Sequence, residues 1–150
     1  MNTIAPTHIR LAYHEAPTEP RIMIFGPMSV DLRLLKKCFR QLSSGEAQIE
    51  FHSLPFVVAS GDVRLRMCSV GRLNNRNARI AFGLRRVEHE RVSFEWTLDC
   101  EEWDDLAELL SPLPLSPEPA HQYLAGDYAD DAIVVVSKGE YDDSVMTQQG

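Results

Sequence analysis

Three neighbouring segments in the middle of the chain alternate apolar and polar residues with a period of two. Their apolar members are Val63, Leu65 and Met67, then Ile80, Phe82 and Leu84, and then Val92, Phe94, Trp96 and Leu98. Successive side chains of a strand point to opposite faces, so the pattern predicts three strands that each bury one face. A turn centred on residues 74–75 and a loop at 88–90 would join them as an antiparallel meander. In this register Leu84 pairs with Leu65 on one side and with Phe94 on the other.

Two amphipathic helices are predicted, one on each side of the meander in the sequence. Ser29 can cap the first helix, which ends at residues 43–45. Its apolar stripe consists of Leu32, Leu35, Phe39 and Leu42. Asp99 begins the second helix, and Glu102 completes a capping box three residues later. The stripe of the second helix consists of Trp103, Leu106, Ala107 and Leu110, and Pro112 ends the helix.

Further short strands are predicted at 21–25, 48–53, 121–124 and 131–137. This order of elements indicates an α+β fold, with a mainly antiparallel sheet, a central three-stranded meander and two helices packed on one face. A chain of 150 residues with 44% hydrophobic and 25% charged residues can form one sufficient core. We therefore expect a single domain over 1–150, with 1–20 and 141–150 poorly ordered.

Cysteine and histidine spacing argues against several kinds of site. Cys38, Cys68 and Cys100 lie far apart without a CxxC pair, and the five histidines show no spacing typical of a metal site. We therefore expect neither a metal nor a cofactor. The first twenty residues hold no apolar run of the length that a signal sequence or a membrane span needs. The expected location is the cytoplasm, with no membrane partner.

Charge is divided unevenly along the chain. Of the 15 Lys and Arg residues, 14 lie in residues 1–98, whereas 13 of the 22 Asp and Glu residues lie in 99–150. Acids in a first helical turn stabilise the helix through its dipole, but Asp105 and Glu108 lie beyond that turn. An acidic surface for a basic partner is the alternative explanation. The candidate partner-binding residues are Glu101, Asp104, Asp105, Glu108, Asp127, Asp130 and Asp131, with Tyr123, Tyr128 and Tyr141 as possible aromatic anchors.

A basic strip is expected on the polar face of the meander, as a candidate anion site. It consists of Arg64, Arg66, Arg79 and Arg85. In the predicted register Arg64 faces Arg85, and like charges opposite each other are destabilising, so Glu95 or a bound anion should compensate them. Sheets that read RNA need exposed aromatic residues, whereas the aromatic residues here fall on the core face. We therefore expect no nucleic-acid partner.

Candidate catalytic groups are few. Cys68, beside Arg66, could have a lowered thiol pKa and is the best candidate nucleophile, and His52 is a candidate base. The glycines form no phosphate-binding loop. No set of residues assembles an active site, so we assign no catalytic residue and favour a binding role over an enzyme.

The chain carries no motif of a named family. In size, acidity and the lack of catalytic residues it resembles, by type, the immunity proteins with which bacteria neutralise toxic enzymes, especially basic nucleases. The resemblance implies a small cytoplasmic protein-binding module that docks its acidic helix and loops onto a basic toxin or nuclease. One alternative is a small enzyme that uses Cys68 or His52 on an anionic substrate. Another is a homodimer that pairs the arginine face of one copy with the acidic helix of the other.

Overall fold

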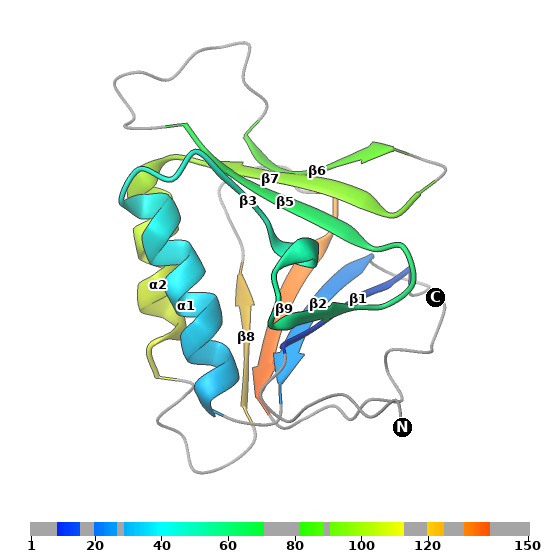
Figure 1. Cartoon of the computed structure of the whole chain (residues 1–150), viewed down its shortest axis with the longest axis horizontal. Coiled ribbons are helices and arrows are strands. Elements are labelled where there is room, and N and C mark those ends of the chain that lie inside the picture. Colours follow the sequence, from blue (N-terminus) through cyan, green and yellow to red (C-terminus); the bar gives the residue numbers. More distant parts are fainter. Residues whose placement is uncertain are drawn as a thin grey trace.

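The computed structural model describes residues 9–15, 20–26, 29–70, 82–88, 91–112, 120–124 and 131–138. These residues form two α-helices, one short 3-10 helix and two mixed β-sheets (Figure 1). The α+β class predicted from the sequence is confirmed. The expected single, mainly antiparallel sheet is only partly matched, because the strands divide between two sheets and three of the seven strand pairings are parallel.

The five-stranded sheet has the order β4-β1-β2-β9-β8. Its strands are β1 (Ile9–His14), β2 (Arg21–Gly26), β4 (Val57–Ala59), β8 (Ala120–Leu124) and β9 (Ile133–Lys138). β2 and β9 are parallel at its centre, where Ile24 pairs with Val136. Both residues are buried, as expected for central strands.

The four-stranded sheet has the order β3-β5-β7-β6. Its strands are β3 (Gln48–Glu50), β5 (Arg64–Ser69), β6 (Gly83–Glu88) and β7 (Ser93–Leu98). β7 runs parallel to β5 and antiparallel to β6. We call the side of this sheet that faces away from the core its outer face.

The predicted three-stranded meander is therefore wrong in its strand order, although its three strands exist. β7 lies between β5 and β6, so Leu65 pairs with Phe94 and has no partner on β6. The β6–β7 hairpin forms as predicted, but Leu84 pairs with Trp96, two residues from the predicted partner. A shift of two residues keeps every side chain on its predicted face.

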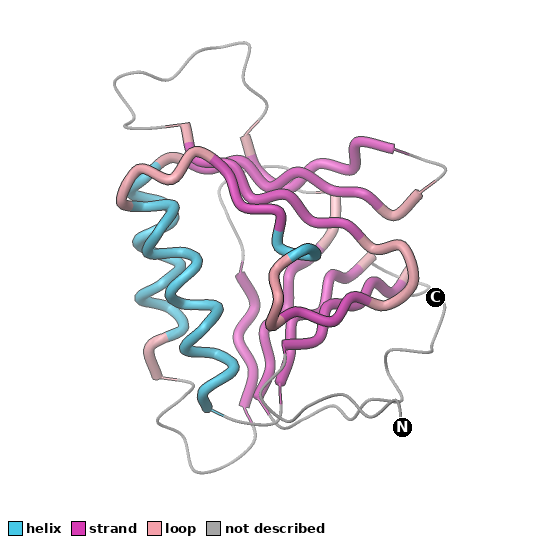
Figure 2. Tube along the Cα trace, viewed as in Figure 1, coloured by secondary structure: helices cyan, strands magenta, loops and turns pink. Residues whose placement is uncertain are grey.

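The two helices are α1 (Ser29–Ser43) and α2 (Cys100–Leu110). All eight stripe residues predicted for them are buried. The helices lie side by side and contact both sheets, and Figure 2 shows them gathered on one side of the strands. Phe39 of α1 packs against Trp96 of β7 and Trp103 of α2, with ring centroids 5.9 and 5.4 Å away. One continuous core thus joins the helices to both sheets.

Two predicted boundaries need correction. We expected residues 1–20 to be poorly ordered, yet Ile9–His14 form β1, with Ile9 and Leu11 fully buried. The strand predicted at 48–53 ends at Glu50, and Phe51–Ser53 form the 3-10 helix η1, which buries Phe51. The short strand β4 was not predicted. Residues 141–150 and the side chain of Ser29 lie outside the described part of the chain.

Candidate functional site

The acidic helix α2 is held firmly at its start. The amide of Glu102 donates to Asp99 Oδ1 at 2.8 Å, and the amide of Asp99 donates to Glu102 Oε1 at 3.1 Å. This is the capping box predicted from the sequence, and Asp99 is fully buried within it. A third hydrogen bond connects α2 to β5, in which Trp103 Nε1 donates to the carbonyl of Cys68 at 3.0 Å. The direction of the helix is thereby fixed relative to the four-stranded sheet.

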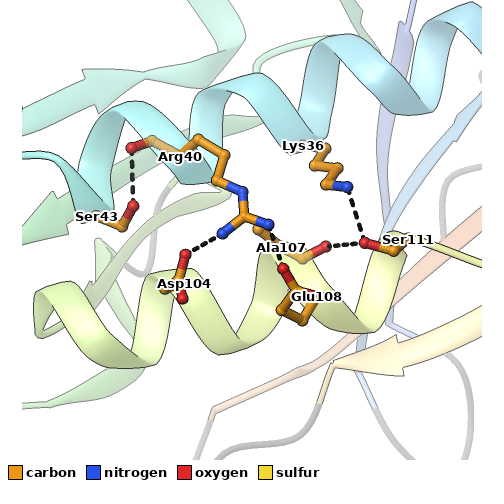
Figure 3. A network of polar contacts seen from close by, with 7 residues as sticks. All are labelled: Lys36, Arg40, Ser43, Asp104, Ala107, Glu108 and Ser111. Atoms are coloured by element: carbon orange, nitrogen blue, oxygen red, sulfur yellow. Dashed lines mark hydrogen bonds and ion pairs between the residues drawn. The ribbon is translucent and has the colours of Figure 1, made fainter.

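Two of the candidate partner-binding acids on α2 are already paired within the chain (Figure 3). The guanidinium of Arg40 on α1 donates to the carboxylates of both Asp104 and Glu108. The hydrogen bond from Arg40 holds the pKa of Glu108 below its usual range, and Glu108 in turn raises the pKa of Arg40. Their first role is therefore to join α2 to α1.

The same helix pair has a second polar contact near the end of α2. Lys36 Nζ donates to Ser111 Oγ at 2.8 Å, and that hydroxyl donates to the carbonyl of Ala107 at 3.3 Å (Figure 3). Ser111 is the C-cap residue of α2. The helix is thus attached to α1 at two levels along its length.

Glu101, Asp105 and Leu109 form the remaining exposed stripe of α2. Residues four apart lie on one side of a helix, and we call these three the α2 stripe. The two acids are exposed and form no hydrogen bond or ion pair with the described part of the chain. Leu109 is 42% exposed, one of three large apolar residues so exposed among the described residues. An exposed apolar side chain on the same side of a helix as two exposed carboxylates has the composition of a small docking surface.

Asp131, another candidate partner-binding residue, is also used within the chain. Its amide donates to the carbonyl of Leu84, and its carboxylate accepts from the amide of Arg86, both at 2.8 Å. These bonds attach the segment before β9 to the free edge of β6, so Asp131 joins the two sheets. Asp127, Tyr128, Asp130 and Tyr141 lie outside the described residues. Tyr123 on the edge strand β8 is 46% exposed.

The arginine strip is only partly as predicted. Arg64, Arg66 and Arg85 share the outer face of the four-stranded sheet, and Arg79 lies outside the described residues. Arg64 does not face Arg85, because β7 lies between their strands. Glu95 of β7 lies directly opposite both Arg66 and Arg85. The carboxylate thus separates two cations that like-charge repulsion would otherwise oppose.

Arg66 forms ion pairs with two acids on this face. Its Nη1 donates to Glu95 Oε2 at 3.2 Å, and its Nη2 donates to Glu50 Oε1 at 3.1 Å. Glu50, Arg66 and Glu95 therefore form a row across β3, β5 and β7. The acids compensate the charge of Arg66, so Arg66 is not the free anion ligand that the sequence suggested.

A pocket of about 250 Å³ opens beside this row. Besides the three residues of the row, it is lined by His52, Arg64, Val87, Ser93 and Phe94. The sequence could not show this pocket, because η1, β5, β6 and β7 each contribute to it. His52 lies there because its Nδ1 accepts from the amide of Leu65 at 3.1 Å.

Cys68 and Cys38 do not have the lowered thiol pKa expected of a nucleophile. Burial, and then the charge of Glu95, raise the pKa of Cys68, which outweighs the opposite effects of Thr97 and Arg66. The predicted lowering of this pKa is therefore wrong in direction. Burial also raises the pKa of Cys38 to about 11, and Cys38 lies in the core.

In the ranges that the structure describes, no three His, Cys, Asp or Glu side chains are grouped so that they could hold a metal ion. Within the same ranges, neither helix has the length and apolar character needed to cross a membrane. A scan against models of known protein families and searches of curated proteins and solved structures found no match to the chain.

Proposed function

We propose that the chain is a protein-binding module that docks the α2 stripe onto a basic protein. The observation that carries this proposal is the contrast along one helix. Asp104 and Glu108 are both paired with Arg40, whereas Glu101 and Asp105, on the same side of α2 as the exposed Leu109, have no such partner among the described residues.

The fixed position of α2 supports this role. A surface that is already in its binding conformation loses less conformational entropy when it binds. The capping box and the buried tryptophan hold the helix near its start, and the Arg40 contacts hold it further along one side. Leu109 then supplies an apolar anchor, and the acids steer a basic partner and fix its orientation.

The partner we propose is a basic enzyme, such as a toxic nuclease, whose site is occupied and thereby blocked. Nucleases bind polyanions and therefore carry basic clefts, which an acidic helix can enter in place of the nucleic acid. The excess of acids in residues 99–150 agrees with such a partner. Inhibition requires occupancy alone, so the module needs no catalytic group of its own.

The test is capture of basic proteins from a lysate of the source organism, with a triple variant Glu101→Gln, Asp105→Asn and Leu109→Ser. The matched control is Glu46→Gln with Asp62→Asn, which removes two exposed acids elsewhere. We expect one basic protein to be held by the wild type and by the control and to be lost with the triple variant. The captured protein should associate more slowly as salt rises, because salt screens exposed charges. Equal capture by all three proteins, or capture by none, would refute the proposal.

A further inference from the structure

Three side chains with free hydrogen-bond donors form a second row on the outer face of the four-stranded sheet. They are His52, Arg64 and Ser93, and all three line the 250 Å³ pocket. Arg64 and Ser93 lie directly opposite each other on β5 and β7, and His52 belongs to η1, which continues from β3. Within the described part of the chain, neither the guanidinium of Arg64 nor the hydroxyl of Ser93 has a hydrogen-bond partner.

The contact of His52 with β5 determines which ring nitrogen is a donor. Nδ1 lies 3.1 Å from the amide of Leu65 and 3.4 Å from the carbonyl oxygen of the same residue. An amide can only donate, and it is the nearer group, so Nδ1 accepts. In the neutral ring the proton is then on Nε2, which is left as a donor. Leu65 holds the ring in place.

The neighbouring acidic row limits the charge of a ligand. Of the charged side chains that line the pocket, Glu50 and Glu95 share one guanidinium, that of Arg66. Arg85 lies opposite Glu95 but does not line the pocket, so these three lining residues carry one net negative charge. Arg64 forms no ion pair within the described residues and supplies one positive charge beside it. A single negative charge can be held at Arg64, whereas a dianion would meet stronger repulsion from Glu50 and Glu95.

The lining of the pocket also includes an exposed apolar side chain. Val87 of β6 is 47% exposed and lines the same pocket. The volume of about 250 Å³ is smaller than that of pockets for drug-sized molecules, which begin at roughly 300 Å³. A ligand that fits has one oxyanion head and a short apolar body.

We propose that this pocket binds a small monocarboxylate, with its carboxylate held by Arg64, His52 Nε2 and Ser93 Oγ, and its apolar part against Val87. A guanidinium matches a carboxylate with two parallel hydrogen bonds. The site lies on the four-stranded sheet and does not depend on the proposed function of α2.

The test is a titration of the full chain with benzoate, followed by the backbone amide signals in nuclear magnetic resonance spectra. We expect saturable shifts confined to the surroundings of residues 52, 64–66, 87 and 93, with a Kd on the order of 1 mM or tighter. Benzamide, which has the same shape without the charge, should bind at least about tenfold more weakly. Inorganic phosphate, compared with benzoate at about pH 8.5 where phosphate is largely a dianion, should also bind more weakly. No saturable shift with benzoate, equal binding of benzamide, or tighter binding of phosphate would overturn the proposal.

Substitutions of the proposed contact residues test where the carboxylate of benzoate binds. Arg64→Gln should weaken benzoate binding at least about tenfold, because a hydrogen bond to a charged group is lost. Arg33→Gln removes another exposed cation, on α1, and should leave the Kd unchanged. Ser93→Ala, a smaller change, should weaken binding by a few-fold. Unchanged affinity in Arg64→Gln, or an equal loss in Arg33→Gln, would show that the pocket does not recognise the carboxylate in this way.

Discussion

The carboxylate of Asp131 accepts a hydrogen bond from the backbone amide of Arg86 at 2.8 Å. Arg86 belongs to the edge strand β6, whose outer edge would otherwise offer its backbone groups to solvent or to another chain. The side chain of Arg86 also contacts the other sheet. Its Nη1 lies 3.6 Å from Glu15 Oε1, and its guanidinium lies over the ring of Tyr13 on β1. Asp131 and Arg86 therefore form a polar seam between the two sheets, which the apolar core also joins.

Asp131→Ala should lower the free energy of unfolding by about 1 kcal/mol, because the Arg86 amide loses its acceptor. The backbone bond from the Asp131 amide to Leu84 stays, which limits the loss. Urea denaturation measures the change, with Asp62→Ala as the control, since Asp62 is exposed. Equal stabilities of the two variants would mean that the seam contributes little.

Arg40→Gln should destabilise the protein at neutral pH and much less in acid. Arg40 lowers the pKa of Glu108, so its contribution is complete above the ordinary value of 4.5 and is lost as the pH falls through the lower folded value. Urea denaturation of wild type and variant, at neutral pH and well below pH 4.5, checks this. The two curves should converge in acid, and a difference independent of pH would contradict the assignment of Arg40 and Glu108 as an ion pair.

Asp99→Ala should lower the stability by at least about 1 kcal/mol, the usual effect of removing an N-cap side chain. Asp99 is fully buried and accepts from the amide of Glu102, which would lose its partner. Asp99→Asn keeps an oxygen in the same place and should retain most of the stability. Thermal unfolding compares the two variants, and similar losses in both would mean that the charge of Asp99 matters more than its capping bond.

Local signals explain what could be predicted from the sequence. Asp99, Glu102 and the spacing of Trp103, Leu106, Ala107 and Leu110 lie within twelve residues, and α2 was predicted with its cap, its stripe and its end. Alternation in β5, β6 and β7 predicted correctly the buried face of each strand within the described residues, which holds Leu65, Met67, Leu84, Phe94, Trp96 and Leu98. It carries no information on which strand is the neighbour, so the insertion of β7 between β5 and β6 was missed.

The candidate site depends on contacts that no local pattern contains. Arg40 lies 64 residues before Asp104 and 68 before Glu108, so nothing in the sequence indicates that these two acids are paired with it. The alternation of Ile9, Leu11 and Tyr13 is present in the sequence, yet we expected residues 1–20 to be poorly ordered and predicted no strand there. The α2 stripe was found in part, through Glu101 and Asp105, whereas the exposure of Leu109 required the structure.

Native Cys68 should react with iodoacetamide more slowly than a free cysteine near neutral pH. Its raised pKa leaves less thiolate at a given pH, because burial and Glu95 both disfavour the charged form. The alkylation rate at Cys68, measured by peptide mapping, should still be rising beyond pH 9.0, the ordinary value for the thiol. Cys38, with a pKa of about 11 and a place in the core, is the internal reference and should react slowest. A Cys68 rate that reaches its plateau below pH 9.0 would instead favour the alternative of a small enzyme with a thiol nucleophile, because only a stabilised thiolate behaves in that way.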